Sequence, residues 1–186
     1  MKRVFIVHGF NGRPEGGWRP WLKLALEKKG FVVHLLKMPS PRFPSKTAWV
    51  KTIQNSIKKP DANTFLIGHS LGCIAILRYL ESLEGKQKVG GAILVAGLAT
   101  NLGNPLFSGF FRSPLDWKKI RIHCNKFVSI NSDNDRFITI AHGKLFEKNL
   151  GAKLILKKGM GHFSGDEGCF KLPVVLEEIL RLASNK

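Results

Sequence analysis

Short apolar runs alternate with longer amphipathic stretches along almost the whole chain. The runs are rich in β-branched and aromatic side chains, whereas the stretches between them repeat leucine and isoleucine at helical spacing. This alternation is typical of a parallel sheet covered by helices on both faces, because each crossover between parallel strands carries a helix. It predicts a three-layer α/β/α sandwich with about six parallel strands. The expected strands are residues 4–7, 31–36, 64–67, 92–96, 127–130 and 153–156.

Helices are expected between these strands, and several of their ends carry a recognisable signal. Ser45 is suited to cap the second helix, and Gly30, Gly85 and Gly151 follow the ends of three others. The expected helices are residues 21–29, 46–57, 71–84, 140–150 and 172–182. The chain has 186 residues and no linker or repeat. We therefore expect one domain, residues 1–186, since domains commonly run about 100–200 residues.

The motif Gly68-His69-Ser70-Leu71-Gly72 follows an expected strand and opens an expected helix. This is the context of the G-x-S-x-G nucleophile elbow, in which a serine occupies a tight strand-to-helix turn. Side chains two residues before and after the serine would collide with the chain, so both positions need glycine. The helix start provides a positive dipole and a free N–H beside the serine oxygen. Ser70 is therefore a candidate nucleophile; the alternative is a serine that only caps the helix.

A serine hydroxyl needs a neighbouring base to take its proton, and six histidines compete for that role. Where this elbow occurs, the chain order is serine, then Asp or Glu, then histidine. His162 fits because it lies in a glycine-flanked loop after the last expected strand. The alternative is a surface loop histidine. His69 is next to Ser70 in the chain, so its side chain is expected to point elsewhere.

The acid is expected on the loop after the fifth strand, where two aspartates qualify. Asp135 is favoured over Asp133, because an aspartate followed two residues later by an apolar pair, here Phe137-Ile138, is the usual form. The other aspartate is expected to cap the turn or the next helix. The acid orients the imidazole and stabilises its charged form without having to accept the proton.

An oxyanion hole needs a second N–H besides that of Leu71. The segment His8-Gly9-Phe10-Asn11-Gly12 ends the first strand, and it faces the elbow if the first and third strands are neighbours. The N–H of Phe10 is the first candidate and that of Asn11 the second. His8 is expected to shape this loop rather than to take part in catalysis.

Together these features resemble the α/β-hydrolase fold, in a short version that lacks the usual first two antiparallel strands. The resemblance implies the strand order 2-1-3-4-5-6, with the serine at the topological switch point. More narrowly, the chain resembles the small serine hydrolases of the YdeN and retinoblastoma-binding serine hydrolase family, nearly from end to end. The residues that carry the likeness are His8-Gly9-Phe10, Trp18, Pro20, Trp21, Leu22, Met38-Pro39, Pro41, Pro44, Trp49, residues 68–72, residues 132–137 and Gly161-His162-Phe163.

The chain departs from the family pattern at Arg136, where proline is common after the acid, and in its longer segment 97–116. The resemblance implies a serine hydrolase that cleaves a small carboxylic ester, thioester or amide. Ser70, Asp135 and His162 would form the triad, and an acyl-enzyme would be the intermediate. No metal or organic cofactor is expected.

The segment 97–116 is unusually apolar for a loop, and long loops in compact domains are usually functional. It has two interpretations, a small flap over the active site or a buried part of the core. Its phenylalanines and two aromatic residues elsewhere are candidates to line an acyl pocket, and core packing is the alternative for all of them. The candidates for substrate contact are Asn11, Trp18, Phe107, Phe110 and Phe163.

The chain carries 30 lysines and arginines against 13 acids, a formal net charge of +17. Such an excess favours an anionic partner. The bases are scattered as singles and pairs without a long basic run, so a nucleic-acid site is not expected. The anionic partner that we expect instead is an acyl substrate. The alternative function is a non-catalytic hydrolase-fold module whose basic surface binds an acidic protein, a membrane or a nucleic acid.

Three widely spaced cysteines without a CxxC pair predict neither a disulfide framework nor a zinc site. The apolar run after Met1-Lys2-Arg3 is short and meets His8-Gly9 at once, so we expect a strand rather than a signal peptide. No apolar stretch of about 18 residues occurs, so no transmembrane segment is expected. The sequence thus predicts a cytoplasmic protein and leaves its oligomeric state open.

Overall fold

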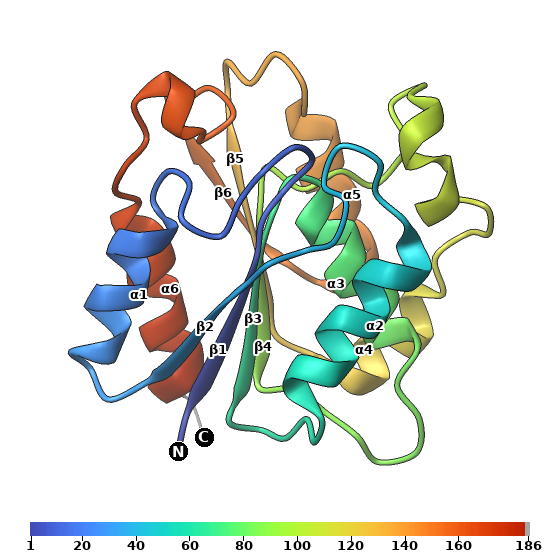
Figure 1. Cartoon of the computed structure of the whole chain (residues 1–186), viewed down its shortest axis with the longest axis vertical. Helices are drawn as coiled ribbons and strands as arrows, with labels where there is room; N and C mark the ends of the chain where they lie inside the picture. Colours follow the sequence, from blue (N-terminus) through green and yellow to red (C-terminus); the bar gives the residue numbers. More distant parts are fainter. Residues whose placement is uncertain (185–186) are drawn as a thin grey trace.

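The computed structural model describes residues 1–184, and at its centre lies a six-stranded sheet. The strand order is β2-β1-β3-β4-β5-β6 and every neighbouring pair is parallel, which confirms the predicted arrangement (Figure 1). The carboxyl ends of β1 and β3 therefore lie side by side where the order reverses. The strands are β1 (Arg3–Val7), β2 (Val32–Leu36), β3 (Thr64–His69), β4 (Gly91–Val95), β5 (Phe127–Ser132) and β6 (Lys153–Lys157).

Helices cover both faces of this sheet, as the sequence predicted (Figure 1). The first and last helices pack on one face, and the other four pack on the opposite face. The helices are α1 (Arg19–Glu27), α2 (Lys46–Ile57), α3 (Leu71–Glu81), α4 (Trp117–His123), α5 (Ile140–Leu150) and α6 (Pro173–Ser184). Two short 3₁₀ helices, η1 (Pro105–Phe110) and η2 (Gly165–Glu167), lie in the connections.

Strand β1 shows how the apolar pattern builds two cores. Phe5 and Val7 point to the face covered by α2, α3, α4 and α5, whereas Val4 and Ile6 point to the face covered by α1 and α6. Successive side chains of a strand alternate between faces, so a continuous apolar run buries both. The central strands β1, β3, β4 and β5 are thereby almost entirely buried, which leaves the loops at the strand ends as the place for a site open to substrate.

The ends of several elements follow the local signals in the sequence. Ser45 caps α2, since its hydroxyl accepts a hydrogen bond from the N–H of Ala48 at 3.4 Å. Gly151 ends α5 in the left-handed region, with a φ of 65°. Helix α4 was not predicted, although Asp116 caps it by accepting a hydrogen bond from the N–H of Lys119 at 2.9 Å.

The segment 97–116 packs against the α2/α3 side of the molecule. Phe110 is fully buried, and its ring meets that of Trp49 edge-on at 5.9 Å. Arg78 of α3 donates hydrogen bonds to the carbonyls of Phe110, at 2.8 Å, and of Ser113. These contacts support the buried interpretation for η1.

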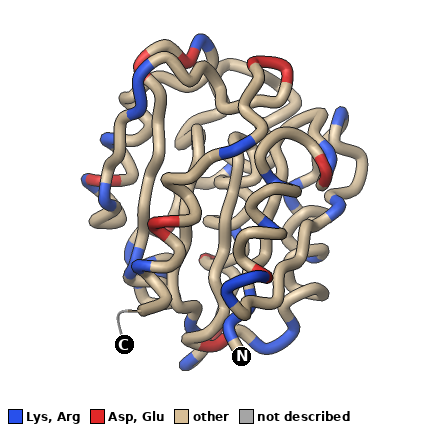
Figure 2. Tube along the Cα trace, turned by 90° about the vertical axis from the view of Figure 1, so that its left-hand side faces the viewer, with Lys and Arg blue, Asp and Glu red and all other residues tan. Residues whose placement is uncertain are grey.

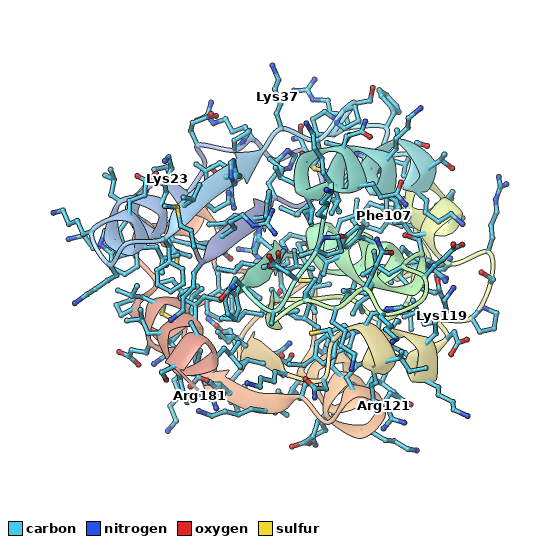
Figure 3. The ribbon with its side chains drawn as sticks, turned by 90° about the horizontal axis from the view of Figure 1, so that it is seen from below. Lys23, Lys37, Phe107, Lys119, Arg121 and Arg181 are labelled. Carbon is cyan, nitrogen blue, oxygen red and sulfur yellow. The ribbon has the colours of Figure 1, made fainter. Side chains whose placement is uncertain are left out.

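The basic residues form no continuous stripe along an element. In Figure 2 they are spread from one end of the molecule to the other. Figure 3 shows Lys23, Lys37, Lys119, Arg121 and Arg181 around the perimeter, pointing outwards. None of the helices in residues 1–184 is both long enough and apolar enough to cross a membrane.

Candidate active site

Ser70 occupies a sharp turn between the end of β3 and the start of α3. Its φ of 54° and ψ of −121° lie in a region that non-glycine residues rarely adopt, so the turn stores backbone strain. The N–H of Ser70 donates to the carbonyl of Val95 at 2.9 Å, which ties the turn to the neighbouring strand β4. Ser70 therefore lies at the carboxyl edge of the sheet, and β3, β4 and α3 together fix its position.

Close packing explains the glycines of this turn. A Cβ atom at Gly72 would lie 2.4 Å from the carbonyl oxygen of Val7, and one at Gly68 would lie 2.8 Å from the backbone of Cys73. Both contacts are too short for a real Cβ atom. A third glycine, Gly9, brings the loop after β1 against the serine, since a Cβ there would lie 2.9 Å from Cβ of Ser70. The elbow and the β1 loop thus meet backbone to backbone.

His162 and Asp135 come from different loops and form a hydrogen-bonded pair. Nδ1 of His162 lies 2.8 Å from Oδ2 of Asp135. Because the carboxylate accepts, Nδ1 carries the proton and Nε2 keeps its lone pair. The other carboxylate oxygen of Asp135 accepts from the N–H groups of Phe137, at 2.9 Å, and Ile138, at 3.0 Å. With its side chain fully buried, Asp135 is held in one orientation.

Asp133 has a different task. Its Oδ1 accepts a hydrogen bond from the N–H of Gly159 at 2.8 Å, at the start of the loop that carries His162. Asp133 is exposed, whereas Asp135 is buried. The structure therefore brings Asp135 to His162 and uses Asp133 to cap the turn.

The backbone of the histidine loop is held by polar side chains whose role the sequence reasoning missed. They come from the end of β5, from the turn that follows it and from η2. The hydrogen bonds run from the N–H of Met160 to Oγ of Ser132 (2.9 Å), from Gly161 to Oδ1 of Asn134 (2.8 Å) and from His162 to Oε2 of Glu167 (2.8 Å). Burial raises the pKa of Glu167, but hydrogen bonds from Ser164 and from the His162 N–H outweigh it and lower that pKa. The carboxylate therefore stays charged and able to accept.

His69 also supports this loop. Nε2 of His69 lies 2.8 Å from the carbonyl oxygen of His162, so Nε2 must carry the proton and donate. Burial, and next the positive charges of His162 and Arg19, lower the pKa of His69 well below 6.5. His69 is therefore neutral near pH 7. Its ring does not point away from the site, as the sequence reasoning supposed, but lies 5.0 Å from the ring of His162.

The two backbone N–H groups that the sequence predicts for the oxyanion hole have no hydrogen-bond partner within residues 1–184. Among the described residues, neither the N–H of Phe10 nor that of Leu71 donates a hydrogen bond. His8 shapes the loop that carries Phe10: its Nε2 accepts from the N–H of Met38 at 3.2 Å, and its Nδ1 lies 2.8 Å from the carbonyl of Gly9. Burial lowers the pKa of His8, so the ring stays neutral.

These groups open into a cleft of about 1060 Å³. Ser70, His162, Phe10 and Asn11 line it, and so does Phe137, whose ring is 58% exposed. Phe137 is not among the residues that the sequence predicts for substrate contact, although an apolar residue two positions after the candidate catalytic acid is an available signal.

Four of the five side chains expected to contact substrate do not line this cleft. Trp18, Phe110 and Phe163 are fully buried, so no substrate atom reaches them in this conformation. Phe107 is also buried and packs edge-on against Phe10, at 5.3 Å between ring centres. These aromatic residues are core, and of the candidates only Asn11 lines the cleft.

Comparison with known proteins places the chain in a family. The family model described as serine hydrolase matches residues 4–181. YdeN of Bacillus subtilis, named provisionally as a hydrolase, is 34% identical over 177 residues, which cover 95% of this chain and 93% of YdeN. The serine hydrolase RBBP9 of Rattus norvegicus is 32% identical over 170 residues, which cover 89% of each chain.

The fold agrees with this relationship. The crystal structure of the ydeN gene product of B. subtilis superimposes with a TM-score of 0.93, and the match covers 100% of both chains at 34% identity. Est1E of Butyrivibrio proteoclasticus shares the fold at 13% identity, with a TM-score of 0.77 and coverage of 99% of this chain and 89% of that one. The chain therefore belongs to the serine hydrolase family, as its sequence motifs indicated.

Proposed function

We propose that this member of the serine hydrolase family cleaves a small carboxylic ester, thioester or amide through an acyl-enzyme formed on Ser70. The observation that carries the proposal is the 2.8 Å pair between His162 and Asp135, together with the cleft that His162 and the strained Ser70 both line. A base whose orientation is fixed by a buried acid is what a serine hydroxyl requires to become a nucleophile.

The first half of the reaction transfers the acyl group to the enzyme. Oγ of Ser70 forms a bond to the carbonyl carbon while its proton moves to Nε2 of His162, and the π electrons of the carbonyl move to its oxygen. The tetrahedral intermediate collapses when the bond to the leaving group breaks. That group takes the proton from Nε2 and departs as alcohol, thiol or amine.

The second half releases the acid and restores the enzyme. A water molecule attacks the acyl carbon while its proton moves to Nε2 of His162. The bond to Oγ then breaks, and the proton returns from His162 to Ser70. Asp135 stabilises the positively charged imidazole in both halves and keeps Nε2 directed at the reacting atoms.

The developing oxyanion needs donors that are in place before the reaction begins. The N–H groups of Phe10 and Leu71 meet this need, since each belongs to a rigid loop or helix start and neither has a partner in the described residues. The positive end of the α3 dipole adds to their effect. Donors of this kind commonly contribute about 10²–10³ in kcat each.

The test combines covalent labelling with turnover. The wild-type protein is treated with a fluorophosphonate probe, and hydrolysis of a p-nitrophenyl ester with a short acyl chain is followed in parallel. We expect labelling and turnover in the wild type and neither in Ser70→Ala. The proposal fails if the wild type shows neither activity while thermal unfolding shows that both proteins are equally well folded.

A further inference from the structure

Arg19 is a buried cation that lines the same cleft as Ser70 and His162. Only 6% of the residue is exposed. Its guanidinium donates to two backbone carbonyls, from Nε to Pro14 at 3.4 Å and from Nη2 to Arg13 at 3.1 Å. Among the described residues, no carboxylate forms an ion pair with it. The hydrogen-bond partners of the guanidinium within residues 1–184 are thus neutral carbonyl groups.

One nitrogen of this guanidinium remains free. Nη1 of Arg19 donates no hydrogen bond within residues 1–184, and Asn131 Nδ2 is the one fully buried side-chain nitrogen without a partner in that range. Nη1 is therefore not fully buried, and Arg19 is one of the residues that line the cleft. Gly16 leaves room for the group, since a Cβ there would lie 2.5 Å from Nη2.

The surroundings of Arg19 favour an anionic ligand. Burial lowers its pKa to about 10, and the negative charge of exposed Glu15 only partly opposes this effect. The guanidinium still carries its charge at neutral pH. A buried cation without a counter-ion is unfavourable, whereas a planar guanidinium binds a carboxylate or phosphate through strong charge-assisted hydrogen bonds.

A series of ring contacts runs from Arg19 to the candidate catalytic base. Its guanidinium lies over the ring of Trp18, 5.8 Å from the ring centre. Trp18 meets His69 edge-on at 6.2 Å, and His69 lies 5.0 Å from His162. This series of packed rings supports the guanidinium at one end and the ring of His162 at the other.

The cleft has other charged residues, and all are at its exposed rim. Arg13 and Arg42 add positive charge there, whereas Glu15 and Asp166 add negative charge. Exposed charges are screened by water and salt much more than buried ones. The buried Arg19 is therefore expected to decide which sign of charge the cleft prefers.

We propose that Arg19 forms an anion subsite in this cleft and that the preferred substrates are esters carrying a carboxylate or phosphate away from the scissile carbonyl. This proposal rests on the proposed function, because it assigns a substrate class to the same site. The anion belongs either to the acyl group or to the leaving group, and both would present the same chemistry to the guanidinium.

Matched ester pairs distinguish these two sources. In the acyl arm, the mono-p-nitrophenyl esters of adipate and suberate are compared with p-nitrophenyl hexanoate and octanoate. In the leaving-group arm, the butyrate ester of 4-hydroxybenzoate is compared with that of 4-hydroxybenzamide. The measured quantity is the ratio of kcat/KM for the charged ester to kcat/KM for its neutral partner, after subtraction of the rate with Ser70→Ala. This ratio does not depend on the fraction of folded enzyme.

In the wild type we expect this ratio to reach at least about tenfold in one arm, the effect of one charge-assisted hydrogen-bonded pair. Arg19→Gln should lower the ratio by about the same factor. Arg19→Lys should keep part of the preference, because lysine keeps the positive charge but lacks the planar set of N–H donors of a guanidinium. The control is Arg121→Gln, which removes one exposed positive charge from α4 and should leave the ratio unchanged.

A second measurement needs no variant and applies even if Arg19→Gln fails to fold. Adipate should inhibit turnover of a neutral ester by the wild type at concentrations where adipamide does not. The proposal is overturned, while the proposed function stands, if neutral esters are hydrolysed but the ratio is one or less in both arms, or if adipate does not inhibit. If neither ester is hydrolysed and Ser70 is not labelled, both proposals fall.

Discussion

At the scale of single residues, Asp133 and Asp135 are the same amino acid two positions apart and have opposite surroundings. Asp133 is exposed and receives one hydrogen bond, from the N–H of Gly159. Asp135 is buried and receives three, from two backbone N–H groups and from His162. An isolated buried carboxylate would be costly, but these three donors compensate its charge. The role of each aspartate thus follows from the donors around it.

The two aspartates provide a matched pair of substitutions. Asp135→Asn should lower kcat by roughly 10³–10⁴, because an amide in this position can hold the wrong imidazole tautomer. Asp133→Asn should stay within about threefold of the wild type, since an amide oxygen still accepts the hydrogen bond from Gly159. The measurement is kcat for a p-nitrophenyl ester. Equal losses in the two variants would show that Asp135 has no special part in the reaction.

His69 is expected to act on the reaction through the backbone of His162, as a positioning residue. Its Nε2–H donates to the carbonyl of His162, and glutamine places an amide N–H at a similar distance from the backbone. His69→Phe should therefore lower kcat by about tenfold with little change in KM, since a misplaced catalytic group is costly. His69→Gln should restore most of the loss.

The contrast between these two variants is the informative result. If His69 only fills space, the phenylalanine variant should be the more active one, because its aromatic ring is closer in shape to the imidazole. Thermal unfolding of both proteins checks that the difference in kcat does not arise from a difference in the folded fraction.

At the scale of elements, the histidine loop shows what local sequence patterns indicate and what they omit. His162 could be singled out because flanking glycines and the preceding strand are both visible in the sequence. The support from Ser132 and Asn134 could not, because these contacts join residues that are close only after β5 and β6 pair. Hydrogen bonds across the fold leave no periodic signal in one strand or helix.

The segment 97–116 illustrates the same difference for apolar residues. Its phenylalanines indicate burial, but the sequence does not say whether they are buried by substrate or by protein. The partners that decide this for Phe110, Trp49 on α2 and Arg78 on α3, lie far from it in the chain. The strand order was easier to predict, because uniform apolar runs alternating with helices permit few arrangements.

Phe110 and Phe137 give this distinction a test. Phe110→Ala should destabilise the protein by about 3–5 kcal/mol, because it leaves a cavity beside Trp49, and should leave KM of the folded enzyme nearly unchanged. Phe137→Ala should cost less than about 1 kcal/mol, since the ring is 58% exposed, yet raise KM for esters with longer acyl chains. Urea unfolding and ester kinetics measure the two effects. If Phe110→Ala raised KM and Phe137→Ala did not, η1 and not the loop after β5 would contact the acyl group.

At the scale of the whole molecule, the excess of positive charge and the buried histidines act on different properties. The charge of +17 comes from many exposed side chains and is not concentrated at one site. Charge of this kind influences solubility and attraction of anions but does not fix the fold. The buried histidines whose pKa is lowered, in contrast, contribute little net charge near pH 7 and couple the stability of the fold to pH.

Three buried histidines have a lowered pKa, and burial is the largest cause for each: His8, His69 and His142. In the unfolded chain they take up a proton near pH 6.5, whereas in the folded protein they do so only at lower pH. The unfolded state therefore binds more protons as the pH falls below about 6.5, and stability must decrease. Asp61, Glu167 and Glu178 have a lowered pKa too, but their contribution is lost only in the more acidic range where carboxylates titrate.

We therefore expect the free energy of unfolding to be nearly constant from pH 8 to 7 and to decrease from pH 6.5 to 5.5, where carboxylates are still charged. The slope should approach about 1.4 kcal/mol per pH unit for each histidine that stays neutral in the folded state. Urea unfolding at a series of pH values measures it. His69→Gln removes the histidine whose pKa lies well below 6.5, so its slope should be shallower than that of the wild type. A stability that rises as the pH falls from 6.5 to 5.5 would mean that these rings gain, rather than lose, protons on folding.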